Sequence, residues 1–200
     1  MAVLVGQPAP DFTAPAVLGN GEISNSFNLA DTIKGKKAVV FFYPLDFTFV
    51  CPSELLSFDN RKQEFEKRNV EVIGVSIDSH WTHNAWRNTP VDQGGIGPVK
   101  YTLVADMKHE ICQAYDVESP GGVAFRGSFL IDEDGIVRHQ VVNDLPLGRN
   151  IDEMLRMVDA LSFHQEHGEV CPAGWKEGDQ GMKANPEGVA SYLSDNASKL

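Results

Sequence analysis

Two apolar runs on either side of a proline turn and a cysteine constrain this chain more than any other feature of its sequence. Residues 37–43 (Lys-Ala-Val-Val-Phe-Phe-Tyr) form a short run of apolar, β-branched and aromatic side chains, which indicates a strand covered on both faces. After a turn at Pro44, Cys51 begins a segment with helical apolar spacing that we expect to end near Arg68, and Val70–Ile77 is apolar again. Strand, helix and strand in this order predict a parallel βαβ unit with a right-handed crossover.

The later segments extend this unit into one α/β domain. Helical patterns occur at 80–88, 108–115 and from Ile151, a short strand pattern occurs at 101–105, and a hairpin is indicated by 127–131 and 136–142. This order predicts a thioredoxin-like fold, a central mixed β-sheet flanked by helices. We assign residues 1–165 to the thioredoxin-like domain. Residues 166–200, which are polar and rich in glycine and proline, are assigned to a C-terminal arm.

The charge balance argues against two classes of partner. The 200 residues include 28 Asp and Glu against 17 Lys and Arg, a formal net charge of −11. A field of this sign repels phosphate groups, so we expect no binding to nucleic acid or to an anionic membrane surface. The sequence shows no signal-peptide pattern and no apolar stretch near the ~18 residues of a membrane span. We therefore expect a soluble, cytoplasmic protein.

The chain has three cysteines, Cys51, Cys112 and Cys171. An odd number spread this widely does not form a structural disulfide framework, and disulfides in a reducing compartment are typically transient and catalytic. Pro52 suits the first helical position, which places Cys51 at the helix N-cap. Unpaired N–H groups and the positive end of the helix dipole favour a thiolate there.

The residues around Cys51 favour a reactive thiol over a small buried hydrophobe, which is the common role of a cysteine among apolar neighbours. Thr48 lies three residues earlier and can place a hydroxyl beside the sulfur, while Pro44 stiffens the loop. Glu54 stands where a Cys-x-x-Cys motif would have its second cysteine. The redox partner of Cys51 is therefore Cys112 or Cys171.

Several blocks resemble the typical two-cysteine peroxiredoxins. Residues 43–54 (Tyr-Pro-Leu-Asp-Phe-Thr-Phe-Val-Cys-Pro-Ser-Glu) resemble the peroxidatic-cysteine segment with its Pro-x-x-x-Thr-x-x-Cys core, and 169–175 (Glu-Val-Cys-Pro-Ala-Gly-Trp) resemble the resolving-cysteine segment. Residues 125–127 (Phe-Arg-Gly) resemble the segment with the active-site arginine, and 78–86 and 143–149 match further blocks. The likeness covers about residues 3–176 in family order.

This resemblance implies a thiol-dependent peroxidase that reduces hydrogen peroxide and organic hydroperoxides, with roles in antioxidant defence and peroxide signalling. Cys51 would become a sulfenic acid, and Cys171 would attack it to form a disulfide between two subunits. Thioredoxin, or a flavoprotein disulfide reductase, would reduce that disulfide. The family also implies a homodimer and a ring of five dimers that touch near residues 78–86. Residues 136–142 are apolar enough to need covering as an edge strand.

The resemblance also assigns supporting roles around the thiol. Thr48 and backbone N–H groups would orient the peroxide and stabilise charge on the leaving oxygen. Arg126 would hold thiolate and substrate together, Pro44 would shape the pocket, and Glu54 would orient the arginine. No family role carries over to Cys112, which we interpret as buried and structural.

Two alternatives from other classes stay open at this point. One is a redox-switched holdase chaperone, and the other is a thioredoxin-like disulfide exchanger without peroxide chemistry. The presence of Thr48 and the missing second cysteine argue against the exchanger.

Other signals give no cofactor or metal site. The pairs His80 with His83 and His164 with His167 have i,i+3 spacing, but useful metal sites need three or four ligands. We interpret both pairs as solvated helix faces. Gly94–Gly97 lacks the Lys-Ser/Thr of a phosphate-binding loop, so we predict no nucleotide site.

Overall fold

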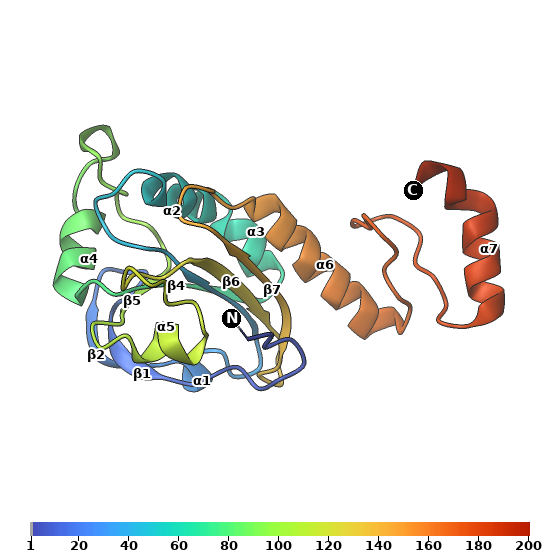
Figure 1. Cartoon of the computed structure of the whole chain (residues 1–200), viewed down its shortest axis with the longest axis horizontal. Coiled ribbons are helices and arrows are strands. Elements are labelled where there is room, and N and C mark those ends of the chain that lie inside the picture. The colour runs from blue at the N-terminus through green and yellow to red at the C-terminus, as the bar shows by residue number, and fades with distance from the viewer. Residues whose placement is uncertain (1) are drawn as a thin grey trace. The chain divides into compact units, whose positions relative to one another are not determined.

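The computed structural model describes residues 2–200, which form two compact units, the first ending at Ile151 and the second running from Asp152 to Leu200. The first unit contains a seven-stranded sheet in the order β2-β1-β5-β4-β3-β6-β7 (Figure 1). Its strands are β1 (Thr13–Val17), β2 (Ile23–Asn28), β3 (Lys37–Phe42), β4 (Val70–Ser76), β5 (Thr102–Ala105), β6 (Arg126–Ile131) and β7 (Val137–Asn143).

The predicted βαβ unit forms the centre of this sheet. β3 pairs in parallel with β4, and β4 pairs in parallel with β5, while β6 pairs antiparallel with the other edge of β3. All six residues of β3 are buried, as the continuous apolar run predicts. The mixed sheet confirms the predicted α/β, thioredoxin-like class.

Helices cover both faces of the sheet, because successive side chains of a strand point to opposite sides. Phe41 of β3 stacks on Phe58 with ring centroids 4.1 Å apart, whereas Phe42 packs on Tyr115 at 5.1 Å. The helices of this unit are α1 (Leu29–Thr32), α2 (Cys51–Asn60), α3 (Lys62–Lys67), α4 (His80–Arg87) and α5 (Glu110–Ala114), with a short 3₁₀ turn at Val91–Gln93. Helix α2 therefore lies on the Phe41 face and α5 on the Phe42 face (Figure 1).

The helix that follows the proline turn differs from the prediction at both ends. Val50 is its N-cap and Cys51 is its first helical residue, because the Val50 carbonyl already accepts the N–H groups of Ser53 and Glu54. The predicted single helix to Arg68 is also interrupted at Arg61, whose backbone (φ −106°, ψ 5°) leaves the helical region between α2 and α3.

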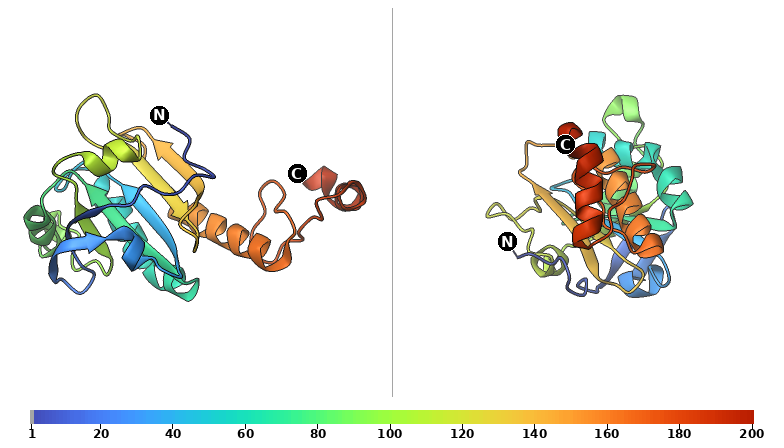
Figure 2. Two further views of the ribbon diagram at one scale, coloured as in Figure 1. Left: turned by 90° about the horizontal axis from the view of Figure 1, so that it is seen from below. Right: turned by 90° about the vertical axis from the view of Figure 1, so that its right-hand side faces the viewer.

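β7 is an edge strand of the sheet. The N-terminal segment pairs with its first residue, where Gly6 donates to the Val137 carbonyl and Val137 donates to the Gln7 carbonyl, at 2.8 and 3.0 Å (Figure 2). Farther along β7, the Leu4 N–H donates to the Gln140 side chain at 2.7 Å. Among the described residues, no other strand pairs with the outer side of β7. The expected edge strand at 136–142 is therefore present.

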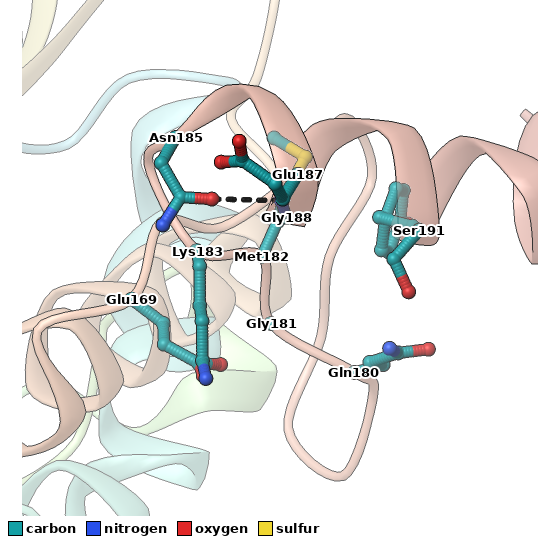
Figure 3. A pocket seen from close by; sticks show the side chains of 10 residues that line it. Glu169, Gln180, Gly181, Met182, Lys183, Asn185, Glu187, Gly188 and Ser191 are labelled. Carbon is teal, nitrogen blue, oxygen red and sulfur yellow. Dashed lines mark hydrogen bonds between the residues drawn. The ribbon is translucent and has the colours of Figure 1, made fainter.

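The second unit contains α6 (Ile151–His167, whose first residue ends the first unit), α7 (Pro186–Asn196) and a 3₁₀ turn at Ala197–Lys199. A bridge between Val170 and Met182 closes the loop after α6. Asn185 caps α7 by accepting the Gly188 N–H at 2.7 Å, beside an open pocket of about 470 Å³ (Figure 3). The division into units thus falls at the start of α6, and our boundary at 165/166 stays a prediction. Within residues 2–200, no helix has the length and apolarity needed to cross a membrane.

Candidate active site

Cys51 is buried at the first turn of α2, with 1% of its surface exposed. Its sulfur receives two polar contacts from different parts of the chain. The Thr48 hydroxyl lies 3.0 Å from Sγ, and Nη1 of Arg126 lies 3.4 Å from it. The structure thus brings together three residues that the sequence analysis selected.

Arg126 is the first residue of β6 and is fixed at both ends of its guanidinium group. Its Nε donates to the Leu145 carbonyl at 2.7 Å, and its Nη1 donates to Oε2 of Glu54 at 2.6 Å. Burial alone would lower the pKa of Arg126, but the contacts with Cys51 and Glu54 outweigh it and raise that pKa above its usual value. Arg126 therefore remains a fixed positive charge beside the sulfur.

Glu54 accepts hydrogen bonds from a second arginine that the sequence analysis did not select. Arg149 donates to the Glu54 carboxylate from Nε at 2.8 Å, from Nη2 at 3.0 Å and from its backbone N–H at 2.9 Å. Burial would raise the pKa of Glu54, but the bonds and charge of Arg149, with that of Arg126, hold it below its usual value. Arg149 is the last residue of the 143–149 block that resembles the family, and this position is the one sequence feature that could have predicted it as a site residue.

The loop before Cys51 is held in a strained shape. Pro44 is buried, and Phe47 adopts a left-handed backbone with φ of 53°, which is uncommon for a bulky residue. The Thr48 hydroxyl also donates to the Leu45 carbonyl at 2.8 Å. The left-handed turn at Phe47 and this bond hold the Thr48 hydroxyl next to the Cys51 sulfur.

A buried polar network lies beneath this loop, and it corrects our interpretation of His83. His83 has no exposed surface, and its Nδ1 lies 2.7 Å from Oδ2 of Asp46 while its Nε2 lies 3.1 Å from the Val104 carbonyl oxygen. The Tyr43 hydroxyl donates to the other Asp46 oxygen at 2.8 Å. Burial raises the pKa of Asp46, partly opposed by His83. The loop is thereby tied to α4 and β5.

The histidine prediction failed because i,i+3 spacing does not show which side chain points inward. His83 is on the buried side of α4, and its carboxylate partner Asp46 is far away in sequence. The other pair, His164 and His167 on α6, is exposed, as predicted.

The three cysteines are free and have distinct surroundings. Cys112 is a buried residue of α5, and burial, followed by the charge of Asp106, raises its pKa to about 12. Cys171 lies in the second unit, where its Sγ is 3.3 Å from the Ala160 carbonyl oxygen. Burial raises the pKa of Cys171, and the charge of Arg156 opposes that effect.

A thioredoxin-like sheet with a buried cysteine at a helix start, contacted by a hydroxyl and a guanidinium, is typical of a thiol-based redox enzyme. The chain matches the AhpC/TSA family over residues 5–140 and the C-terminal domain of 1-Cys peroxiredoxin over residues 160–195. It belongs to the AhpC/TSA family, the peroxiredoxins, and is a thiol-dependent peroxidase.

Relatives in several organisms agree with this assignment. The chain is 59% identical to alkyl hydroperoxide reductase C of Buchnera aphidicola subsp. Schizaphis graminum, over 95% of the chain and 96% of the relative. It is 51% identical to peroxiredoxin-1 of Gallus gallus, over 95% of each. The reduced 2-Cys peroxiredoxin of Plasmodium vivax superimposes with a TM-score of 0.93 at 47% identity, covering 96% of this chain and 100% of that one. These relatives give no specific support to the holdase or the disulfide exchanger.

Proposed function

We propose that Cys51 is the peroxide-reacting thiol of this enzyme and that its substrates are hydrogen peroxide and organic hydroperoxides, alkyl hydroperoxides included. The observation that carries this proposal is the convergence of Thr48 at 3.0 Å and Arg126 at 3.4 Å on one sulfur. Both groups can contact the sulfur and an oxygen bound next to it. The alkyl hydroperoxide reductase C relatives support the substrate class.

In the first step, the Cys51 thiolate attacks one peroxide oxygen and the O–O bond breaks. The sulfur takes that oxygen as a sulfenic acid, and the other oxygen leaves with the bonding electrons and a proton, as water or an alcohol. Arg126 and Thr48 stabilise the negative charge that develops on the leaving oxygen, a role that groups fixed before the reaction perform well. Pro44 limits access of water to the sulfur, and Glu54 orients Arg126.

In the second step, the Cys171 thiol attacks the Cys51 sulfenic sulfur, releases water and leaves a disulfide. Cys51 is 1% exposed and lies inside the first turn of α2. The turn must therefore open before a second sulfur reaches it. A dithiol reductant, thioredoxin or a flavoprotein disulfide reductase, then reduces the disulfide by thiol exchange. No resident cofactor or metal is needed for this cycle.

We further propose that the disulfide joins two subunits of a homodimer and that five dimers form a ring. β7 is an edge strand of the sheet, and no strand of residues 2–200 pairs with its outer side; we propose that the dimer partner covers this edge, since such edges are normally covered. Trp81 of the 78–86 block is 64% exposed, and Phe47, which packs on Trp86 of the same block with ring centroids 5.7 Å apart, is 52% exposed. Covering such side chains favours a ring contact. The three free thiols suit a reducing compartment, for which we propose the cytoplasm.

The test compares Cys51→Ser, Cys171→Ser and Cys112→Ser with the wild type. We expect peroxide consumption to stop in Cys51→Ser, to end after one turnover in Cys171→Ser, and to continue in Cys112→Ser. On a non-reducing gel, peroxide should produce a covalent dimer in the wild type and in Cys112→Ser alone. Turnover that survives Cys51→Ser would refute the assignment, and a monomeric oxidised wild type would refute the disulfide between subunits.

A further inference from the structure

Three side chains with metal-binding atoms converge at the start of α5. A ring nitrogen of His109, Sγ of Cys112 and a carboxylate oxygen of Glu118 all lie within 4.8 Å of one another. Cys112 belongs to the core cluster on the Phe42 side of the sheet, whereas α2 and Cys51 lie on the Phe41 side. The cluster is therefore separate from the active site.

The backbone around α5 holds these side chains together. His109 precedes the helix in a left-handed conformation with φ of 63°, and Cys112 follows at i+3, on the same side. Asp106 accepts the backbone N–H groups of Ile111 and Cys112 at 3.0 and 2.8 Å, which fixes the first turn.

Glu118 comes from the loop after α5 and is positioned by two contacts. Gln113 donates to its Oε2 at 2.9 Å, and its Oε1 lies 2.5 Å from Nδ1 of His109. His109 and Glu118 are partly exposed at 29% and 24% of their side-chain surface. An ion can therefore reach the cluster from solvent, while the Cys112 sulfur closes its inner side.

The negative groups around Cys112 favour a bound cation. The Asp106 carboxylate accepts the Cys112 N–H at 2.8 Å, and a carboxylate oxygen of Glu118 lies within 4.8 Å of the sulfur. A divalent ion would balance these negative charges and deprotonate the thiol that coordinates it.

We propose that His109, Cys112 and Glu118 bind one Zn²⁺ or a similar borderline-soft divalent transition-metal ion, with water as a fourth ligand. One nitrogen, one sulfur and one oxygen ligand match the donors that Zn²⁺ takes in proteins, and three protein ligands with water complete a tetrahedron. The Cys112 proton leaves to solvent, Nδ1 of His109 gives its lone pair to the ion, and no electron is transferred. The bound ion would connect α5 to the loop that carries Glu118.

The experiment uses the full-length Cys51→Ser/Cys171→Ser variant, in which Cys112 is the remaining thiol. Co²⁺ serves as the spectroscopic probe, since a thiolate ligand gives a charge-transfer band in the near ultraviolet. We expect one Co²⁺ per chain, release of a proton, and loss of the band when Zn²⁺ is added. His109→Ala and Glu118→Gln, made in the same background, should weaken Co²⁺ binding by more than about tenfold, because even groups that only support a ligand are worth about 10–100-fold.

His164→Ala is the matched control, since His164 is an exposed histidine on α6 outside the cluster, and it should bind Co²⁺ as its parent does. Circular dichroism verifies the fold of each variant. Absence of the thiolate band in the folded parent would overturn the proposal. A band that is unchanged in both His109→Ala and Glu118→Gln would also overturn it, and would leave a His109–Glu118 ion pair beside an inert thiol.

Discussion

Replacing Thr48 with valine tests whether its hydroxyl takes part in the reaction with peroxide. Valine keeps the branched shape but removes the oxygen that lies 3.0 Å from the Cys51 sulfur and 2.8 Å from the Leu45 carbonyl oxygen. The hydroxyl has one hydrogen, so it donates either to the carbonyl or to the reacting atoms. This is the arrangement expected of a group that changes partner as charge moves from sulfur to the leaving oxygen.

The two lost contacts of Thr48 have different expected magnitudes. Loss of the bond to Leu45 should lower the free energy of unfolding by about 0.5–1.5 kcal/mol, the net worth of an ordinary hydrogen bond. Loss of a donor aimed at developing charge lowers a rate by about 10²–10³, equivalent to about 2.7–4 kcal/mol. The effect on the rate should therefore exceed the effect on stability.

The assay measures the second-order rate constant for Cys51 oxidation by hydrogen peroxide in a single turnover, by rapid quenching and mass spectrometry. Thr48→Ser restores the hydroxyl and should recover most of the rate. Thr89→Val is the control, because Thr89 donates its hydroxyl to the Ala85 carbonyl at 2.9 Å in a similar way but contacts no reacting group. A valine variant as fast as the wild type, or a serine variant as slow as valine, would show that the hydroxyl plays no part.

Four further predictions concern the buried groups Glu54, Cys112 and His83. Glu54→Gln should lower the unfolding free energy by about 3–5 kcal/mol, because it leaves two buried arginines without their carboxylate. Glu64→Gln is the control, because Glu64 pairs with Lys67 and Arg68 at the surface, and it should change the unfolding free energy far less. Urea titration measures both variants. The fold lowers the pKa of Glu54, so wild-type stability should fall as the pH drops below 4.5, the usual pKa of glutamate, and on through the lowered pKa. The stability difference between the wild type and Glu54→Gln should shrink over the same pH window. A difference that stays constant would contradict the assignment. Iodoacetamide at pH 8 should alkylate Cys112 far more slowly in native protein than in urea, since the thiol is buried with a pKa of about 12. Rapid labelling of Cys112 in the native protein would contradict its burial. His83→Ala should lower the melting temperature measured by calorimetry, because one oxygen of the buried Asp46 loses its histidine partner. Asn84→Ala, on the same helix, should change the melting temperature little.

The sequence predicted those elements whose signals are local. β3 is a continuous apolar run and β4 is largely apolar, and α4 and α6 begin at His80 and Ile151, where the helical patterns were predicted to begin. β1 and β2 were not predicted. β1 contains a proline and β2 has the residues Ile-Ser-Asn-Ser-Phe-Asn, so neither has a clear apolar run, and their pairing with each other and with β5 forms them.

The candidate site was predictable only where the chain has a motif. Cys51 and Thr48 lie three residues apart, so one segment carries both. The contacts of Glu54 with Arg126 and Arg149 span 72 and 95 residues, and spacing along the chain does not indicate such pairs. The pair with Arg126 was expected from the family resemblance alone, and the pair with Arg149 was not predicted. The same limit applies to His83 with Asp46 and to the cluster of His109, Cys112 and Glu118.

The charges around Cys51 explain how a buried glutamate can lie near the sulfur without cancelling the charge of Arg126. The site contains two guanidinium groups, Arg126 and Arg149, and both contact Glu54. Two positive charges share one carboxylate, so the three groups together carry one net positive charge, and Nη1 of Arg126 lies 3.4 Å from the Cys51 sulfur. In the peroxide reaction proposed above, negative charge moves from this sulfur to the leaving oxygen, next to that net positive charge. On that proposal Arg149 balances Glu54, which leaves the charge of Arg126 for the sulfur and the peroxide.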